Sequence, residues 1–282
     1  MPELPEVETI RRQLEPQLLG ADIIDAGSHW SDKFTPARDA IGGAFVAARR
    51  RGKYLLFDLA FHDPADGGQA RPATSELIVH LGMTGRLGVD DSGADTDLDH
   101  PHLRAWWRLD DDRIITFHDI RRFGRIHLVA RGDHQTIPTL RDLGPEPWDD
   151  AFDARHLAAF VKRSDRHLKT ILLSQRAVAG VGNIYADEAL WDAAINPATR
   201  RLSPERAERL VAAVRRALES GLRHGGTTLR DYVDGAGTPG MNQHELACYG
   251  RRGEPCRRCG TELRTRVLDA RTTTFCPTCQ AR

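Results

Sequence analysis

Short alternating runs of apolar and polar residues fill the first half of the chain and predict β-strands there. These runs are rich in β-branched and aromatic residues, and clusters of Gly, Asp and Pro separate them. They cover residues 41–46, 54–59, 77–79, 103–109, 113–117 and 125–129. Repeated strands at this spacing are typical of an antiparallel sandwich. A helix precedes them, because Val7, Ile10 and Leu14 recur at helical spacing before Pro16 and Gly20.

The apolar period becomes helical in the second half of the chain. The proline-rich segment 143–148 indicates a linker, and residues 63–72 predict a surface loop. Asp153 can cap one helix, and Ser203 followed by Pro204 can open a longer one that ends at Gly225. The apolar face of that longer helix comprises Ala207, Leu210, Val211, Val214 and Leu218.

A glycine-containing turn runs into a helix over residues 179–191. Amide groups at a helix start can hold a phosphate, and a tight turn between two helices explains the pattern equally well. The segment lacks the glycine spacing and the preceding strand of a dinucleotide site.

Composition places the chain among globular proteins that have no membrane span. Of its 282 residues 40% are hydrophobic and 28% charged, which is enough for two cores. No apolar run approaches the roughly 20 residues that cross a bilayer. The start has neither the basic nor the apolar region of a signal peptide, so we expect a cytoplasmic protein.

Charge is distributed unevenly although the formal net charge is zero. Beyond Cys248 only Glu254, Glu262 and Asp269 oppose a set of arginines. These are Arg251, Arg252, Arg257, Arg258, Arg264, Arg266, Arg271 and Arg282. A basic end fits a polyanionic partner, although a soluble zinc module would look similar.

Four of the five cysteines form two C-x-x-C pairs near the C-terminus. They are Cys256, Cys259, Cys276 and Cys279. Two such pairs can offer four thiolates to one tetrahedral ion, which predicts a single structural Zn²⁺. Two disulfides are the alternative, and a reducing cytosol disfavours them. Cys248 lies outside the pattern and is expected to be a small buried residue.

The N-terminus contains a candidate nucleophile. A small second residue normally permits removal of the initiator methionine, and Pro2 would then present a secondary amine beside Glu3 and Glu6. An α-amino group needs less tuning than lysine to lose its proton and form a Schiff base. The alternative is an ordinary frayed terminus.

Six segments, taken in order, closely resemble the formamidopyrimidine-DNA glycosylases. They are Pro2–Thr9, Gly52–Leu55, His80–Gly85, Arg121–Gly124, Gly180–Ala186 and Tyr249–Arg251, the last leading into the four cysteines. Leu4 resembles this branch more than the related endonuclease VIII branch, which usually has a glycine there. The resemblance spans the whole chain.

The resemblance implies an α+β protein in several parts. We expect an N-terminal catalytic β-sandwich with a leading helix over 1–143 and a linker over 144–150. A helix-two-turns-helix DNA-binding domain would cover 151–247, and a zinc-finger β-hairpin 248–282. The expected partner is double-stranded DNA with an oxidised base, and a monomer is expected.

The resemblance also implies site residues. Pro2 is the expected nucleophile, Glu3 the general acid and base, and Lys53 lies near the acid and the lesion phosphate. Met83, Arg121 and Phe123 match the residues that fill the space left by an extruded base. Residues expected to bind the DNA backbone are Lys169, Asn183, Tyr249 and Arg271. Arg271 is also expected to be one of the catalytic residues. Glu6 and His102 are expected to be DNA-binding residues.

The implied activity is that of a bifunctional glycosylase and lyase for oxidised purines in base excision repair. Two alternatives stay open: an endonuclease VIII-type glycosylase for oxidised pyrimidines, and a non-catalytic zinc-dependent protein that binds damaged DNA. The chain departs from the family at Ile120, at Ser174, at Met241-Asn242 and in the insertion near 63–74. These departures bear on lesion preference, because the segment 225–243 resembles the loop that closes over the purine.

Overall fold

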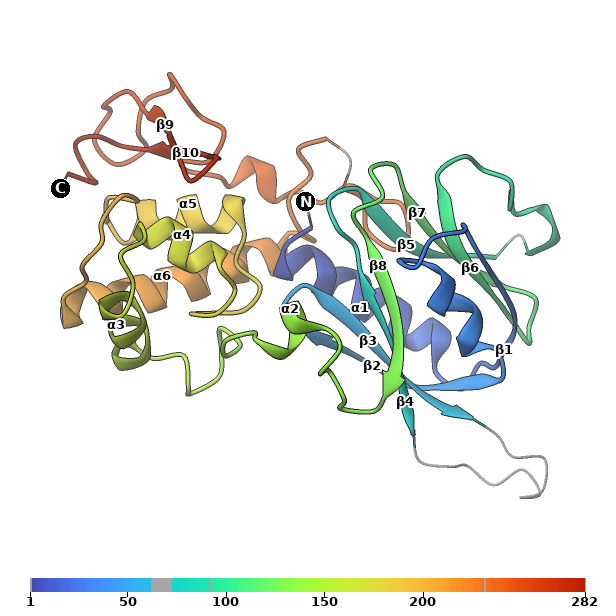
Figure 1. The fold of residues 1–282 in the computed structure, drawn as a ribbon. Helices are drawn as coiled ribbons and strands as arrows, with labels where there is room; N and C mark the ends of the chain where they lie inside the picture. Colours follow the sequence, from blue (N-terminus) through green and yellow to red (C-terminus); the bar gives the residue numbers. More distant parts are fainter. Residues whose placement is uncertain (1, 62–72, 92, 231, 282) are drawn as a thin grey trace. The chain divides into compact units, whose positions relative to one another are not determined.

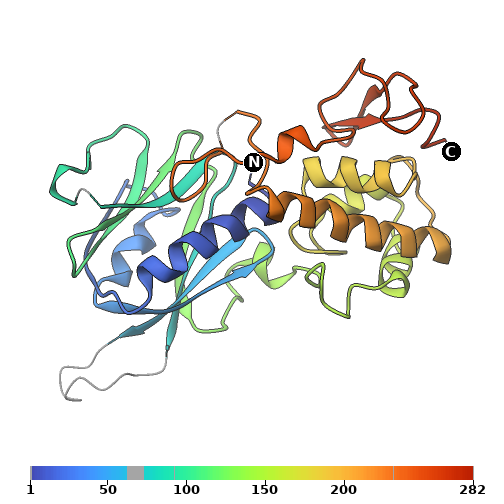
Figure 2. The same ribbon diagram turned by 180° about the vertical axis from the view of Figure 1, so that it is seen from behind.

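The computed structural model describes residues 2–61, 73–91, 93–230 and 232–281, so the predicted loop over 63–72 lies outside the described residues (Figures 1 and 2). The chain forms two compact units. Unit 1 comprises residues up to 141 together with 225–240, and unit 2 comprises 142–224 and 241–282. The prediction that all of 151–247 forms one helical domain therefore differs from the structure at 225–240.

Two four-stranded antiparallel sheets build unit 1. One has the order β1 (Ile23–Ser28), β6 (Leu103–Leu109), β7 (Ile114–Asp119), β5 (Gly85–Asp90). The other has the order β2 (Gly43–Arg51), β3 (Tyr54–Phe61), β4 (Ser75–His80), β8 (Arg125–Ala130). Residues of both sheets share one apolar core, which confirms the predicted sandwich.

Helices close both open edges of this sandwich. Helix α1 (Leu4–Leu18) runs alongside the sheets (Figure 2) and contacts the edge strands β2 and β5. Its residues Val7, Ile10 and Leu14 belong to the core. The 3₁₀ helix η1 (Thr35–Ala40) contacts the opposite edge strands β1 and β8. Its Ala37 carbonyl accepts a 2.9 Å hydrogen bond from the indole of buried Trp107. Covered edges leave few backbone groups free to pair with another chain.

Strands β1 and β5 do not appear in the prediction. Strand β1 has a register shift after Ile23, so its apolar residues do not alternate regularly. Strand β5 contains two glycines that weaken the apolar signal. Both glycines are packed closely, since a Cβ would lie 2.1 Å from the Leu81 carbonyl oxygen at Gly85 and 2.7 Å from the Gly235 oxygen at Gly88.

Unit 2 contains the predicted helices and the hairpin, and two further short helices that the apolar pattern did not predict. They are α3 (Ala154–Lys162), α4 (Leu168–Leu173), α5 (Asn183–Asp192), α6 (Pro204–Arg223), η4 (Asn242–His244), β9 (Arg264–Leu268) and β10 (Arg271–Phe275). Asp153 and Ser203 cap α3 and α6 as predicted, accepting amide hydrogen bonds of 2.6 Å and 3.3 Å. Helix α6 packs on α3 and α5.

The described residues of unit 1 also form two short helices, α2 (Pro138–Arg141) and η3 (Gly93–Asp95). Among the described residues, no helix combines the length and apolar character that a membrane span needs.

Hydrogen bonds to α1 explain why the segment 225–240 belongs to unit 1. The Gln13 side chain donates to Asp234 Oδ2 at 2.7 Å and accepts from the Gly235 amide at 2.8 Å. One turn from the start of the same helix, Glu6 Oε1 accepts from the Thr227 amide at 2.7 Å. The predicted purine loop is therefore anchored at two points of the leading helix.

Candidate active site and DNA-binding surface

The start of α1 is buried and ordered by a carboxylate. Glu3 is the N-cap residue, and its amide donates to Glu6 Oε2 at 2.7 Å, while the other Glu6 oxygen holds Thr227. Pro2, Glu3 and Glu6 are all buried. The alternative of a frayed terminus is therefore wrong for Pro2. Two carboxyl groups lie within one helical turn of the candidate nucleophile.

Lys53 lies in the two-residue turn between β2 and β3. Arg51 pairs with Tyr54, and Gly52 adopts a φ of 56°, which suits a tight hairpin. The Lys53 side chain is buried.

The start of α1 points toward this same turn. Arg11 donates to the Ala48 carbonyl at 3.0 Å, and one turn nearer the N-terminus Glu8 accepts from Arg50 at 3.1 Å. Arg11 therefore contacts Ala48, and Glu8, which is closer to the N-terminus, contacts Arg50, which is closer to Lys53. The N-terminal end of α1 thus points toward Lys53.

His80 ends β4 beside this turn and stays neutral. Its ring lies 4.6 Å from the Tyr54 ring, and its Nδ1 accepts from the Gly82 amide at 3.3 Å. Burial, followed by the positive charges of Lys53 and Arg125, lowers the pKa of His80 to about 4. A neutral ring can keep accepting the Gly82 hydrogen bond at neutral pH.

We therefore predict that His80 contributes to acid denaturation. Because its folded pKa lies below the ordinary value, the unfolded chain takes up the proton first as pH falls, and stability is lost between about pH 6.5 and pH 4. His80→Gln should reduce the slope of unfolding free energy against pH in this window. Urea titrations of both proteins at pH 8 and pH 4.5 test this, with the pH 8 difference as the control. An unchanged slope would refute it.

Three loops meet at one end of the sheet that contains β3. Tyr54 pairs with His80, and His80 pairs with Arg125, so the turn at Lys53, the β4–β5 loop and the β7–β8 loop follow adjacent strand ends. The first loop carries Lys53, the second Met83, and the third Arg121 and Phe123. The fold thus gathers residues far apart in the sequence.

Asp119 joins the two loops expected to enter DNA. Its Oδ1 accepts from the Thr84 hydroxyl at 2.6 Å, and its Oδ2 accepts from the Gly124 amide at 2.7 Å. Thr84 in turn accepts from the Arg121 amide at 3.1 Å. Gly82 is required at this junction, since a Cβ there would lie 2.5 Å from the Gly124 nitrogen. No motif in the sequence indicated this role for a single aspartate.

The tips of these loops present the expected side chains to solvent. Phe123 is 48% exposed, and the Arg121 guanidinium lies 4.7 Å from its ring centroid. Met83 is half-buried, and Ile120, which replaces the usual proline, is 52% exposed. Large apolar groups held in water at glycine-bounded tips suit insertion into a base stack.

His102 lies beside the same junction and is half-buried. Its carbonyl accepts from the Asp119 amide at 2.9 Å. Its ring packs edge-on against His100, which in turn packs against His118. The main chain of His102 is thus tied to the loop junction that Asp119 holds, and its expected contact with DNA stays a prediction.

Lys169 is buried in the structure. It is 1% exposed, and its ammonium lies 2.7 Å from Asp187 Oδ1 and 3.0 Å from the Thr272 carbonyl. Asp187 Oδ2 also accepts from the Thr274 amide at 2.9 Å. Burial raises the pKa of Asp187 to about 7, against the opposing effect of Lys169. Lys169 thus links α4, α5 and β10 in the structure, and its expected contact with the DNA backbone stays a prediction.

The other candidates of unit 2 surround this link. Asn183 begins α5 and donates to the Thr272 carbonyl at 3.3 Å. Tyr249 is half-buried, and its amide is one of three in succession that donate to Glu188, with those of Ala247 and Cys248, at 2.7–2.9 Å.

Arg271 is exposed at the tip of the β9–β10 hairpin. The tip consists of Asp269 and Ala270, both with positive φ, and Thr170 and His167 hold the Asp269 carboxylate. A tip fixed in this way can present a guanidinium to a phosphate at a defined place.

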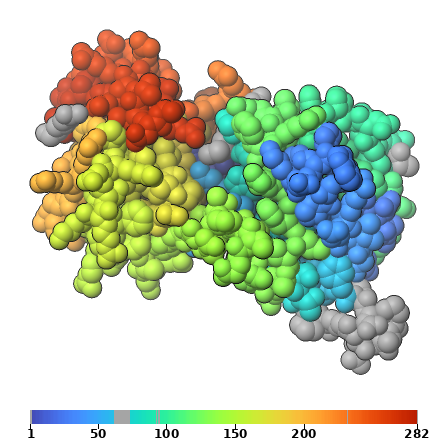
Figure 3. Space-filling model, in the orientation of Figure 1, coloured from blue at the N-terminus to red at the C-terminus, as the bar shows by residue number. Residues whose placement is uncertain are grey.

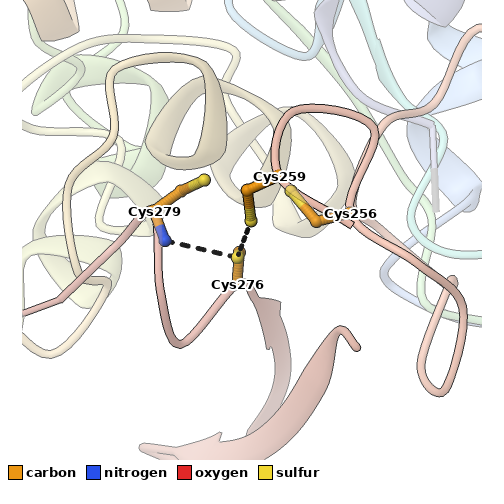
Figure 4. Close-up of side chains that lie close together, drawn as sticks. All are labelled: Cys256, Cys259, Cys276 and Cys279. Carbon is orange, nitrogen blue, oxygen red and sulfur yellow. Dashed lines mark hydrogen bonds between the residues drawn. The ribbon is translucent and has the colours of Figure 1, made fainter. Parts of the chain in front are cut away.

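The four predicted cysteines converge on one point (Figure 4). Their sulfur atoms all lie within 4.8 Å of one another, and those of Cys259 and Cys276 are 3.6 Å apart. Sulfurs bound to one tetrahedral Zn²⁺ at about 2.3 Å would be separated by roughly 3.8 Å. The cluster fits a single structural Zn²⁺, and the alternative of two disulfides is wrong, since all five cysteines are free thiols.

Local donors complete this metal site. Cys256 Sγ accepts from the Trp191 indole at 3.3 Å and from the Arg258 amide at 3.5 Å, and Cys276 Sγ accepts from the Cys279 amide at 3.3 Å. Such hydrogen bonds stabilise thiolates. Cys248 is buried beside the cluster and donates to the Thr274 carbonyl, as expected of a residue outside the ligand set. Within unit 2, strand β10 of the hairpin packs on α5, and Figure 3 shows the residues near the C-terminus, in red, beside the helical residues in yellow.

The departures at Ser174 and Met241-Asn242 have simple local structures. Ser174 ends α4, and its hydroxyl donates to the Ile171 carbonyl at 2.6 Å. Met241 is 55% exposed, whereas Asn242 is buried and its Oδ1 accepts from Ser220 at 2.9 Å.

Comparison with family models gives matches to three consecutive parts of the chain. The formamidopyrimidine-DNA glycosylase N-terminal domain matches residues 1–126, and the formamidopyrimidine-DNA glycosylase H2TH domain matches 143–233. A zinc finger found in FPG and IleRS matches 253–282.

Individual proteins are similar over their full length. A formamidopyrimidine-DNA glycosylase of Deinococcus radiodurans is 42% identical, over 99% of this chain and 97% of the relative. The crystal structure of the MutM (FPG) protein of Thermus thermophilus is 43% identical with a TM-score of 0.87, covering 100% and 99% of the two chains. A Lactococcus lactis FPG mutant in complex with a Fapy-dG containing DNA is 31% identical with a TM-score of 0.87, covering 100% of both.

Proposed function

Because this chain belongs to the formamidopyrimidine-DNA glycosylase family, we propose that it excises oxidised purines from duplex DNA and then cleaves the strand at the abasic site. The expected lesions are formamidopyrimidines and 8-oxoguanine. One observation carries the proposal. Pro2 and Glu3 are buried immediately before α1, and this end of the helix points toward buried Lys53. Lys53 lies at the end of the sheet from which the loops of Met83 and Phe123 extend.

Pro2 acts as the nucleophile after removal of Met1. Its amine bonds to C1′ while the glycosidic bond breaks and the base leaves with the electron pair. Glu3 protonates the sugar ring oxygen, the ring opens, and an iminium remains between Pro2 and C1′. Loss of the C2′ proton and then of the C4′ proton expels the 3′ and 5′ phosphates in turn, and hydrolysis of the iminium frees Pro2.

Lys53 and Glu6 support this chemistry without forming bonds. The buried ammonium of Lys53 would attract the lesion phosphate. Glu6 fixes the Glu3 amide on one side and Thr227 on the other, so it positions both the acid and the start of the purine loop.

The base must leave the stack before it reacts, which costs a few kcal/mol and less for a damaged base. Met83 and Phe123 would fill the space, and Arg121 would bond to the unpaired partner base. Asn183, Tyr249 and Arg271 would bind backbone phosphates, and the zinc ion would hold the hairpin that carries Arg271. The proposed monomeric state follows from the family resemblance.

Borohydride trapping tests this proposal directly. The protein is incubated with duplexes carrying 8-oxoguanine opposite cytosine, formamidopyrimidine opposite cytosine, or thymine glycol, with an undamaged duplex as control, and the adduct is mapped by mass spectrometry. We expect a covalent adduct at Pro2, with the highest yield on the two purine lesions. A higher yield on thymine glycol would favour the pyrimidine alternative, and tight binding with no adduct would favour the non-catalytic one.

A further inference from the structure

Trp30 is the most exposed of the large apolar side chains in the described part of the chain, at 86%. It lies in the segment 29–33 between β1 and η1, outside every motif considered above. An indole is rarely left in water to this extent unless it meets a partner, because its ring is large and apolar. The groups around Trp30 indicate which kind of partner fits.

The segment around Trp30 is fastened to the loop that carries Phe123. Lys33 Nζ donates to the Arg122 carbonyl at 2.9 Å, and Arg122 has the left-handed φ of 57° that exposes this carbonyl. At the other end of the segment, the His29 amide donates to the Arg104 carbonyl at 2.8 Å.

Arg104 also contacts the junction of the two loops. Its buried guanidinium donates to the Asp119 carbonyl at 2.7 Å, and the Asp119 carboxylate joins the Met83 and Phe123 loops. Segment 29–33 and the two loops thus form one hydrogen-bonded assembly within unit 1.

The chemistry of this surface fits a nucleic acid. Trp30, Ile120 and Phe123 expose apolar groups, and Arg121 and Arg122, between the last two in the sequence, expose cationic groups. The exposed acid of segment 29–33 is Asp32. Aromatic faces between cations suit bases and sugars between phosphates, since every base and deoxyribose offers an apolar face. A protein surface does not have the regularly spaced phosphates that these cationic groups would bind.

We propose that Trp30 is an additional DNA-binding residue, which packs its indole on a sugar or base of the duplex beside the site entered by Phe123. This inference rests on the proposed function. The contact adds affinity without reading sequence, because it uses an apolar face and no base-edge hydrogen bond. It also extends the bound surface beyond the residues that the family resemblance implied.

Affinity measurements with two variants test the contact. The probe is a duplex with a tetrahydrofuran abasic analogue, which the enzyme binds but cannot excise. We expect Trp30→Ala to weaken binding at least about fivefold and Trp30→Phe to retain most of the affinity. The slope of log affinity against log salt should stay the same, since no phosphate contact is lost. Trp148→Phe, at a half-exposed tryptophan of unit 2, is the matched control.

Fluorescence gives an independent readout of the same contact. The emission that distinguishes wild type from Trp30→Phe should become shielded from acrylamide when duplex is added. Unchanged affinity of Trp30→Ala together with an accessible indole in the complex would overturn the proposal. A loss of self-association with normal DNA affinity would overturn it in favour of a protein contact. Wild-type excision of 8-oxoguanine, measured in parallel, tests the proposed function separately.

Discussion

Replacing Glu3 with Gln is expected to slow release of the damaged base by a factor of about 10² to 10⁴, because general acid–base catalysis contributes on this order. The amide keeps the size and polarity of the side chain but cannot transfer a proton. The Glu3 amide would still donate to Glu6, so the start of α1 should stay in place. Affinity for the tetrahydrofuran duplex should therefore change only a few-fold.

Single-turnover kinetics on an 8-oxoguanine duplex measures this effect, and affinity is measured beside it. Glu15→Gln is the matched control, because Glu15 lies on the same helix, is partly exposed and pairs with Arg11 at its surface. That variant should react at the wild-type rate. A Glu3→Gln protein that releases the base within threefold of wild type would exclude Glu3 as the proton donor.

Buried carboxylates hold the functional segments in a common way. Glu6 accepts the amides of Glu3 and Thr227, Asp119 accepts donors from both tip loops, and Glu188 accepts three successive amides. Charge-assisted hydrogen bonds of this kind are short and strong, so each fixes a loop that side-chain packing alone would leave free. Burial raises the pKa of Glu188, while its three amide donors oppose that rise.

Local signals in the sequence predicted most of the fold and the parts of the site that depend on motifs. The apolar alternation identified six of the eight strands described in the sandwich, and the cysteine spacing identified the metal ligands. Caps at Asp153 and Ser203 were also correctly predicted, because a cap acts within its own turn. These features share one property, which is that partner residues lie close together along the chain.

Features that depend on distant partners could not be predicted in this way. No local pattern singled out Asp119, because its partners Thr84 and Gly124 come from two loops. Lys169 matched a DNA-binding position, but burial beside Asp187 is a property of the packed helices. The hydrogen bond from Gln13 to Asp234 joins residues 221 positions apart, so no local signal shows that 225–240 groups with unit 1.

Removing zinc is expected to unfold the hairpin of unit 2 and to weaken DNA binding at least about tenfold. The apolar cluster here is small: Cys248, Cys256, Leu263 and Cys276, with Trp191 and Cys279 against it. So few buried groups cannot offset the entropy of ordering this segment, whereas a structural zinc site supplies about 10–16 kcal/mol. Loss of the hairpin would release Arg271, and the salt slope of affinity should fall by about one for that phosphate contact.

Loss of zinc is expected to leave the reaction at Pro2 intact, because the four cysteine ligands and Pro2 belong to different compact units. Cys259→Ser and chelation should remove amide-exchange protection over β9 and β10 while the strands of unit 1 stay protected. Cys248→Ser is the matched control, since that thiol is buried beside the cluster but is not a ligand. It should retain one zinc per chain and near-normal affinity.

At saturating protein, the Pro2 adduct should still form on the 8-oxoguanine duplex without zinc, since the buried carboxylates that order the N-terminus remain. Normal affinity in a zinc-free protein would contradict the structural role of the metal, and loss of unit 1 protection would contradict the independence of the two units.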